Sequence, residues 1–206
     1  QLIVDAEWAS RKSNRLNRLI RSAEYAIPGA SVENIEYLPD RKLDKALISR
    51  LASCTYVLET NNVIILGATG AGKTYLASAL GMAANRNFYA VRYIRLPDLL
   101  AEFAISRGDG TYRKVMKKYK QVKLLILDEY LLFPLKESEA RDLLEIVEAR
   151  HKVASTIFCS QFAAAGWYAK IGEPTLADAI CDRIVHNSYT MKIDGDSMRK
   201  RKGIAE

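Results

Sequence analysis

Short, wholly apolar runs alternate along most of this chain with longer segments in which apolar residues recur with a helical period. Runs such as "VIIL" and "LLIL" are apolar at every position, which is typical of strands buried on both faces of a sheet. The expected strands cover residues 63–66, 88–94, 123–127, 155–160 and 189–193. The helices expected between them cover residues 73–85, 97–106, 111–119, 137–151 and 175–185. This alternation predicts an α/β fold in which helices sandwich a parallel sheet.

The segment before the first expected strand has a different pattern. Residues 5–25 place Leu16, Leu19 and Ile20 on one side of a predicted helix and several arginines on another. A connector that contains glycine and proline follows, since these residues interrupt the helical period. A second amphipathic helix is expected over residues 41–53.

We expect two parts in the chain: a basic N-terminal helical segment at residues 1–32 and an α/β domain at residues 33–206. The sequence starts without Met or a signal-peptide pattern, so we expect the first part to be the end of a longer domain. No run reaches the roughly 18 apolar residues of a membrane helix. The three cysteines share no CxxC spacing, which favours a reduced, cytoplasmic protein.

The net charge of +7 is concentrated in three basic clusters, at residues 11–21, 107–123 and 199–202. Clustered cations favour a polyanionic partner, because each phosphate they neutralise releases counterions. A solvated helix face is the alternative for any single cluster, but three clusters in one chain favour nucleic acid. The residues expected to contact duplex DNA are Arg11, Arg15, Arg18, Arg113, Lys114, Lys117 and Lys118.

The stretch "GATGAGKT" follows the strand expected at residues 63–66 and opens the next helix. It satisfies the G-x-x-x-x-G-K-[ST] pattern, whose glycines allow successive backbone N–H groups to surround a phosphate. Lys73 is expected to reach the β- and γ-phosphates of ATP, and the Thr74 hydroxyl is expected to bind Mg²⁺. The nucleotide-binding residues are Gly67, Ala68, Thr69, Gly70, Ala71, Gly72, Lys73 and Thr74.

Two adjacent carboxylates, Asp128 and Glu129, end the apolar strand "LLIL". In enzymes with this phosphate loop, an Asp at the end of such a strand holds magnesium. An adjacent Glu can deprotonate the attacking water, as hydrolytic ATPases require. Small-molecule kinases have no need of this second carboxylate, because their substrate supplies the nucleophile. Two solvated acids at a strand end are the alternative, and the phosphate loop upstream makes hydrolysis the stronger reading.

Together with these two motifs, the segment "EPTLADAICDRIVHNSYTMKIDGDSMRKRK" resembles the IstB-type transposition helper ATPases. These are AAA+ proteins related to the DnaC and DnaI helicase loaders. The resemblance covers nearly the whole chain and is densest in this segment. It implies an AAA+ P-loop NTPase fold for residues 33–206, without a large helical lid after the core.

The resemblance also implies roles for three further residues. Ser160 or Gln161 would position the hydrolytic water, and asparagine or threonine is more usual at that position. Arg183 matches the arginine that reaches the γ-phosphate of a neighbouring subunit. An ion pair with an Asp on its own helix is the alternative for Arg183. Arg199 matches the sensor-2 arginine, and membership of a basic tail is its alternative.

The expected function is therefore that of an ATPase that assembles as a homo-oligomer on duplex DNA and recruits or activates a transposase. ATP and Mg²⁺ would lie at subunit interfaces. A helicase loader that acts with single-stranded DNA is the main alternative. A small-molecule kinase and a nucleotide-gated module that hardly hydrolyses ATP are two others.

Overall fold

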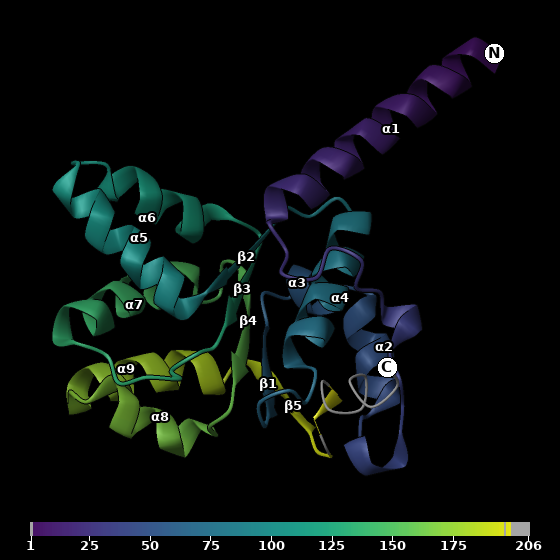
Figure 1. Cartoon of the computed structure of the whole chain (residues 1–206). Helices are drawn as coiled ribbons and strands as arrows, with labels where there is room; N and C mark the ends of the chain where they lie inside the picture. Colours follow the sequence, from purple (N-terminus) through teal and green to yellow (C-terminus); the bar gives the residue numbers. More distant parts are fainter. Residues whose placement is uncertain (1, 196, 199–206) are drawn as a thin grey trace, which may run out of the picture.

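The computed structural model describes residues 2–195 and 197–198, with the backbone alone for residues 2–6, 8 and 9. Five parallel strands form one sheet in the order β2-β3-β4-β1-β5 (Figure 1). Their bounds are Asn62–Gly67 (β1), Val91–Arg95 (β2), Leu124–Asp128 (β3), Ser155–Ser160 (β4) and Ser188–Ile193 (β5). The predicted parallel sheet is confirmed.

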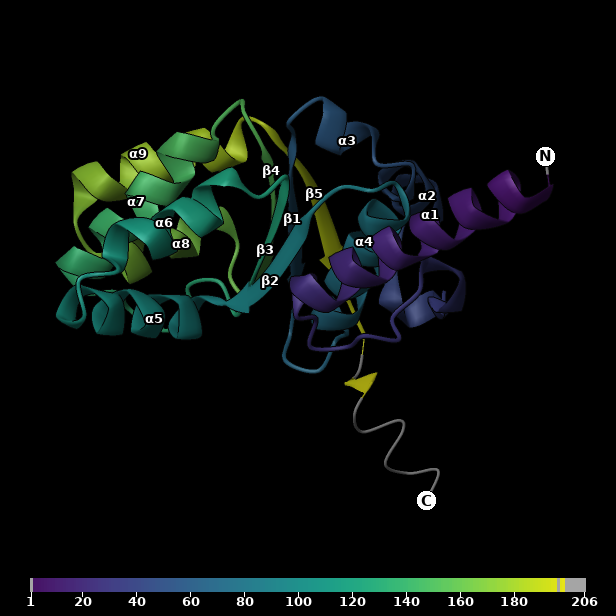
Figure 2. The same cartoon turned by 90° about the horizontal axis from the view of Figure 1, so that it is seen from above.

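The helices divide between the two faces of this sheet (Figures 1 and 2). One face carries α1 (Leu2–Ala23), α2 (Lys45–Ala52), α3 (Thr55–Leu58) and α4 (Lys73–Arg86). The other carries α5 (Leu96–Gly108), α6 (Tyr112–Gln121), α7 (Glu137–Arg150), α8 (Ala164–Ile171) and α9 (Pro174–Val185).

Alternation along the strands produces two cores. In β3, Leu124 and Ile126 pack with the first group of helices, whereas Leu125 and Leu127 pack with the second. All four side chains are fully buried. The continuous apolar runs in the sequence therefore reflect a sheet that is covered on both sides.

Two predicted boundaries are wrong because local backbone geometry overrides the apolar pattern. β2 starts at Val91 rather than at residue 88, since Phe88 has a φ of 62° and belongs to the turn after α4. α2 starts at Lys45 rather than at residue 41, because Lys42 adopts left-handed backbone and Asp44 caps the helix by accepting from the Leu47 N–H at 2.9 Å. Helix α8 was not predicted.

Helix α1 projects from the body, with its N-terminal end far from the sheet (Figures 1 and 2). Its last turns are anchored in the core: Ile20 packs against the first core and Ala23 is fully buried. Within the described part of the chain, no helix has both the length and the apolar character needed to cross a membrane.

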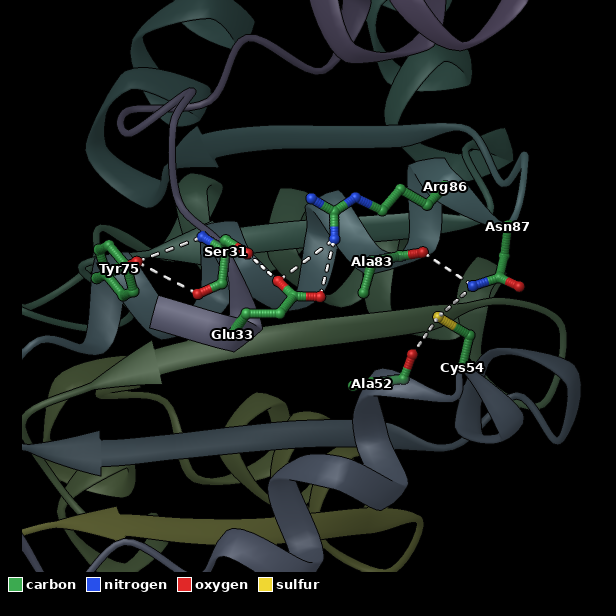
Figure 3. Close-up of polar contacts among 8 residues, drawn as sticks. All are labelled: Ser31, Glu33, Ala52, Cys54, Tyr75, Ala83, Arg86 and Asn87. Atoms are coloured by element: carbon green, nitrogen blue, oxygen red, sulfur yellow. Dashed lines mark hydrogen bonds and ion pairs between the residues drawn. The ribbon is translucent and has the colours of Figure 1, made fainter. Parts of the chain in front are cut away.

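The connector, residues 24–38, contacts helix α4 at two places (Figure 3). The Tyr75 hydroxyl donates to the Ser31 carbonyl at 3.2 Å and lies 3.3 Å from the Ser31 N–H. At the other end of α4, Arg86 pairs with Glu33 at 3.1 Å. The connector is therefore held at both ends of the helix that follows the phosphate loop.

Arg150, in the last turn of α7, ties helix α6 to the sheet. It is 2% exposed and donates to the carbonyl oxygens of Tyr119 at 2.9 Å and Val122 at 2.7 Å. It also donates to the Ser155 carbonyl and to the Thr156 hydroxyl, the latter at 2.9 Å. Burial lowers the pKa of Arg150 to about 9, which leaves the guanidinium charged near neutral pH.

Replacement of Arg150 by Ala should destabilise the protein by at least about 3 kcal/mol, because several buried acceptors lose their donor at once. The midpoint of urea unfolding measures this change. Arg141→Ala is the matched control on the same helix, since Arg141 forms an exposed pair with Glu137 and should matter by less than about 1 kcal/mol. Equal midpoints for the two variants would contradict the structural role of Arg150.

Candidate functional site

The phosphate loop, residues 67–74, connects the carboxyl end of β1 to the start of α4. Gly70 and Gly72 have φ values of 80° and 98°, which a residue with a side chain rarely adopts. Lys73 begins α4, and its ammonium group donates to the carbonyl oxygens of Gly67 at 2.7 Å and Ala68 at 2.8 Å. The loop backbone therefore surrounds the Lys73 ammonium group at the N-terminal end of α4. The positive charge of the lysine and the positive end of the helix dipole together favour binding of an anion.

Asp128, at the end of β3, lies beside this loop and is 4% exposed. Its Oδ2 accepts from the Thr74 hydroxyl at 2.7 Å and from the Tyr93 hydroxyl at 2.8 Å. Its Oδ1 accepts from the Glu129 N–H at 2.8 Å. The two residues predicted to bind magnesium are thus brought together.

Tyr93 was not predicted as a site residue. It lies on β2, the neighbour of β3, and burial, followed by the negative charge of Asp128, raises the pKa of its hydroxyl. The hydroxyl therefore stays protonated and keeps donating to the carboxylate. The sequence shows a tyrosine in a strand, but only the strand order shows which carboxylate its hydroxyl contacts.

Glu129 lies just past the end of β3, with a φ of 51° and a side chain that is 36% exposed. Its carboxylate faces Arg95, whose Nη1 is 3.5 Å away. Arg95 is itself held by Asp98 through two hydrogen bonds of 2.7 and 2.9 Å. Hydrogen bonding to Asp98, and then the charge of Glu129, raise the pKa of Arg95. Arg95 therefore holds the carboxylate that was predicted to act on water, and sequence reasoning missed it.

Ser160 ends β4 and is 1% exposed. Its hydroxyl donates to the Tyr130 carbonyl at 3.0 Å and accepts from the Trp167 indole N–H at 3.1 Å. It also accepts from the Phe162 N–H at 3.2 Å. The single hydroxyl proton of Ser160 is thus engaged inside the protein, whereas Gln161, the other residue considered for this role, is exposed.

A cavity of about 410 Å³ opens beside the phosphate loop. One wall is formed by the loop and α4, with Lys73, Thr74 and Tyr75. The connector and the segment after it contribute the apolar residues Ile27, Ile35 and Leu43, together with the polar or charged residues Asn34, Glu36 and Arg41. A flat apolar group attached to phosphates fits such a cavity, because apolar side chains line it together with the lysine and threonine of the phosphate loop.

Arg183 lies near the C-terminal end of α9, shortly before β5 begins. Its guanidinium pairs with Glu148 of α7 at 2.9 Å, rather than with an Asp of its own helix. Strands β1 and β5 are parallel neighbours, so their amino ends lie at the same edge of the sheet. Arg183 precedes the amino end of β5, whereas the phosphate loop follows the carboxyl end of β1. A strand of this length spans roughly 20 Å. Arg183 is therefore at the edge of the sheet opposite its own phosphate loop, and Arg199 lies outside the described residues.

The candidate DNA contacts lie on two helices. On α1, Arg11, Arg15 and Arg18 are exposed, although Arg11 pairs with Glu7 and Arg15 stacks 5.2 Å above the Phe88 ring.

On α6, the side chains of Arg113, Lys114 and Lys117 are exposed, and among the described residues none of them has an ion-pair partner. Lys118 differs from these three because it pairs with Glu102 at 3.3 Å.

The two basic helices approach the edge strand β2 from opposite faces of the sheet (Figure 1). Arg92 of β2 pairs with Glu24, the residue directly after α1. The same Arg92 also interacts with Tyr119 in the last turn of α6. The two basic clusters, which are about 100 residues apart in the sequence, are thus connected through one strand.

Solved structures share this arrangement of sheet and helices. DnaA from Aquifex aeolicus, bound to AMPPCP, has a TM-score of 0.69 and 22% identity over 87% of this chain and 56% of its own. The chain thus spans little more than half of that protein. The DnaC helicase loader has a TM-score of 0.68 and 16% identity over 80% of this chain and 97% of its own. At such identities the likeness shows the fold alone, which is the predicted AAA+ fold.

The sequence comparison is more specific. The insertion sequence ATP-binding protein y4pL of Sinorhizobium fredii is 40% identical over 204 residues, which cover 98% of this chain and 82% of the relative. The model of the IstB-like ATP binding protein family matches residues 1–205. The match therefore includes the phosphate loop, the carboxylates beside it and both basic helices, and the chain belongs to the family of IstB-like ATP binding proteins.

Proposed function

We propose that this ATP-binding protein hydrolyses ATP when it assembles on duplex DNA and that it recruits or activates the transposase of an insertion sequence. The observation that carries the proposal is the contact between the Asp128 carboxylate and the Thr74 hydroxyl, with a second carboxylate on the next residue, Glu129. A site that only bound nucleotide would not need a second carboxylate poised at the strand end.

In the proposed reaction, Lys73 neutralises the charge of the β- and γ-phosphates, and Glu129 accepts a proton from the attacking water. The Thr74 hydroxyl and the Asp128 carboxylate are hard oxygen donors in mutual contact, a donor set that suits Mg²⁺ and would hold it there. When bound, the metal ion supplies positive charge to the phosphate oxygens. Tyr93 keeps Asp128 in place.

The position of Arg183 supports assembly. Since it lies at the edge opposite its own phosphate loop, its guanidinium would act on the nucleotide of a second copy. In that assembly the Arg183–Glu148 pair opens and the guanidinium turns to the phosphate. Because ATP then contacts two subunits, its binding energy favours the oligomer.

The proposed DNA surface combines α6 with the basic side of α1. Since Arg113, Lys114 and Lys117 have no ion-pair partner among the described residues, these cations can contact phosphates without first leaving such a partner. Such contacts bind duplex DNA without reading its bases, as a protein that accepts many target sequences requires.

A triple variant, Arg113→Ala with Lys114→Ala and Lys117→Ala, should bind duplex DNA less tightly and with a weaker salt dependence. The slope of log K against log[salt] should fall by about 2 to 3, because each lost phosphate contact contributes about 0.9. Fluorescence anisotropy with a labelled duplex across several salt concentrations measures the slope.

The matched control removes the same charge elsewhere: Arg141→Ala with Lys152→Ala and Lys170→Ala. If the slope of log K against log[salt] falls by the same amount in both triple variants, net charge rather than the α6 surface governs binding. Tighter binding of single-stranded DNA than of duplex would instead support the helicase-loader alternative.

A further inference from the structure

Three segments that are distant in the sequence meet at Arg41, which lies just before α2. Its side chain is 6% exposed, although a guanidinium carries a permanent charge. Nη1 donates to the Glu36 carbonyl of the connector at 2.7 Å, and Nη2 donates to the Ala71 carbonyl of the phosphate loop at 3.1 Å. The backbone carbonyl of Arg41 accepts from the Asp194 N–H, after β5, at 3.1 Å.

The guanidinium also lies directly against Gly72, the last residue before α4. A Cβ added to Gly72 would come within 2.9 Å of Nη2 of Arg41, and the φ of 98° at Gly72 already disfavours a side chain. Glycine at this position therefore leaves room for the arginine to reach the loop.

The hydrogen bond to Ala71 has a consequence for the next N–H group. In a trans peptide, the C=O and the N–H point in opposite directions. Because Arg41 holds the Ala71 carbonyl, the Gly72 N–H of the same peptide points away from the guanidinium. Inward N–H groups are what bind phosphate in such loops.

We propose that Arg41 is a positioning residue of the nucleotide site, which orients the Ala71–Gly72 peptide toward the phosphates and adds a second fixed positive charge beside Lys73. Arg41, Gly72 and Lys73 line the same cavity. This inference rests on the proposed binding of a nucleoside triphosphate by the loop. It extends the site to a residue outside the phosphate loop.

The test measures binding of a fluorescent ADP analogue, and of inorganic tripolyphosphate as its competitor, to the full chain. Tripolyphosphate has no base and therefore reports on the phosphate loop alone. Arg41→Ala should weaken both ligands by the same factor, about 10- to 100-fold, because a charge-assisted hydrogen bond is lost. Arg41→Lys keeps the charge but has one donor nitrogen in place of the two that reach the Glu36 and Ala71 carbonyls, so an intermediate loss is expected.

Two control variants separate positioning from general effects. Arg50→Ala removes an exposed arginine of α2 that stacks on the Tyr189 ring, and it should leave both affinities unchanged. Ile35→Ala removes an apolar side chain from the cavity lining, so it should weaken the ADP analogue but not tripolyphosphate.

The inference is overturned if the folded Arg41 variants bind tripolyphosphate as tightly as the unchanged protein does. It is also overturned if Arg41→Ala weakens only the ADP analogue. Circular dichroism shows which variants are folded, and Arg41→Lys serves if Arg41→Ala is not. Failure of the unchanged protein to bind either ligand would instead count against the proposed function, so the two failures are distinguishable.

Discussion

Glu129→Gln should bind ATP as tightly as the unchanged protein and hydrolyse it at least about 10²-fold more slowly. The amide has the same shape as the carboxylate and can still accept a hydrogen bond from Arg95, 3.5 Å away in the present structure. It cannot take a proton from water near neutral pH. Binding and assembly should therefore survive while turnover is lost. Phosphate release and nucleotide affinity, measured on the same preparation with duplex DNA, test this expectation.

Glu137→Gln is the matched control for this variant. Glu137 lies on α7, a few residues beyond Glu129, and forms an exposed pair with Arg141 at 2.6 Å. Its loss should change turnover less than twofold, since exposed ion pairs contribute little. Normal turnover in Glu129→Gln would mean that another group activates the water, and the present assignment of the base would then be abandoned.

Arg183→Ala should lower turnover by about 10³- to 10⁵-fold, the range reported for an arginine supplied to the γ-phosphate in trans. Because the residue lies at the opposite edge from its own phosphate loop, the defect should be complemented between subunits. Mixing Arg183→Ala with Lys73→Ala creates sites with an intact loop from one copy and an intact arginine from the other. The mixture should therefore hydrolyse ATP faster than either variant alone.

The ion pair with Glu148 provides the control for this second variant. If Arg183 served only to join α9 to α7, Glu148→Gln would lower turnover as much as Arg183→Ala does. We expect it to retain turnover, because the pair has to open when Arg183 contacts a nucleotide. A mixture of Arg183→Ala and Lys73→Ala that stays inactive, although the two variants co-assemble, would show that the arginine does not act between subunits.

The site divides into residues that a local pattern identifies and residues that it does not. Lys73, Thr74, Asp128 and Glu129 follow from glycine spacing and from carboxylates that end an apolar strand. Arg95 has no such local signal, because its contact with Glu129 exists only when β2 is the neighbour of β3.

Arg41 illustrates the same limit. The periodicity predicted it as the first residue of an amphipathic helix, whereas it precedes that helix and is buried against the phosphate loop. Lys42 has left-handed backbone and ends the preceding turn, and helix α2 begins only after its cap, Asp44. The helical period therefore does not apply at Arg41. Ser160 shows a further case, since its hydroxyl proton is taken by the Tyr130 carbonyl, a partner far from it in the sequence.

The sequence by itself determined the parallel α/β fold, the phosphate loop and the adjacent carboxylates. These depend on side-chain period and on short spacings, which are properties of contiguous residues. Tertiary structure alone decided that Arg95 holds Glu129, that Arg41 supports the Ala71–Gly72 peptide and that Arg183 faces away from its own loop. These placements concern residues that are far apart in the sequence, and the packing of strands, helices and connector, rather than any local pattern, sets which of them meet.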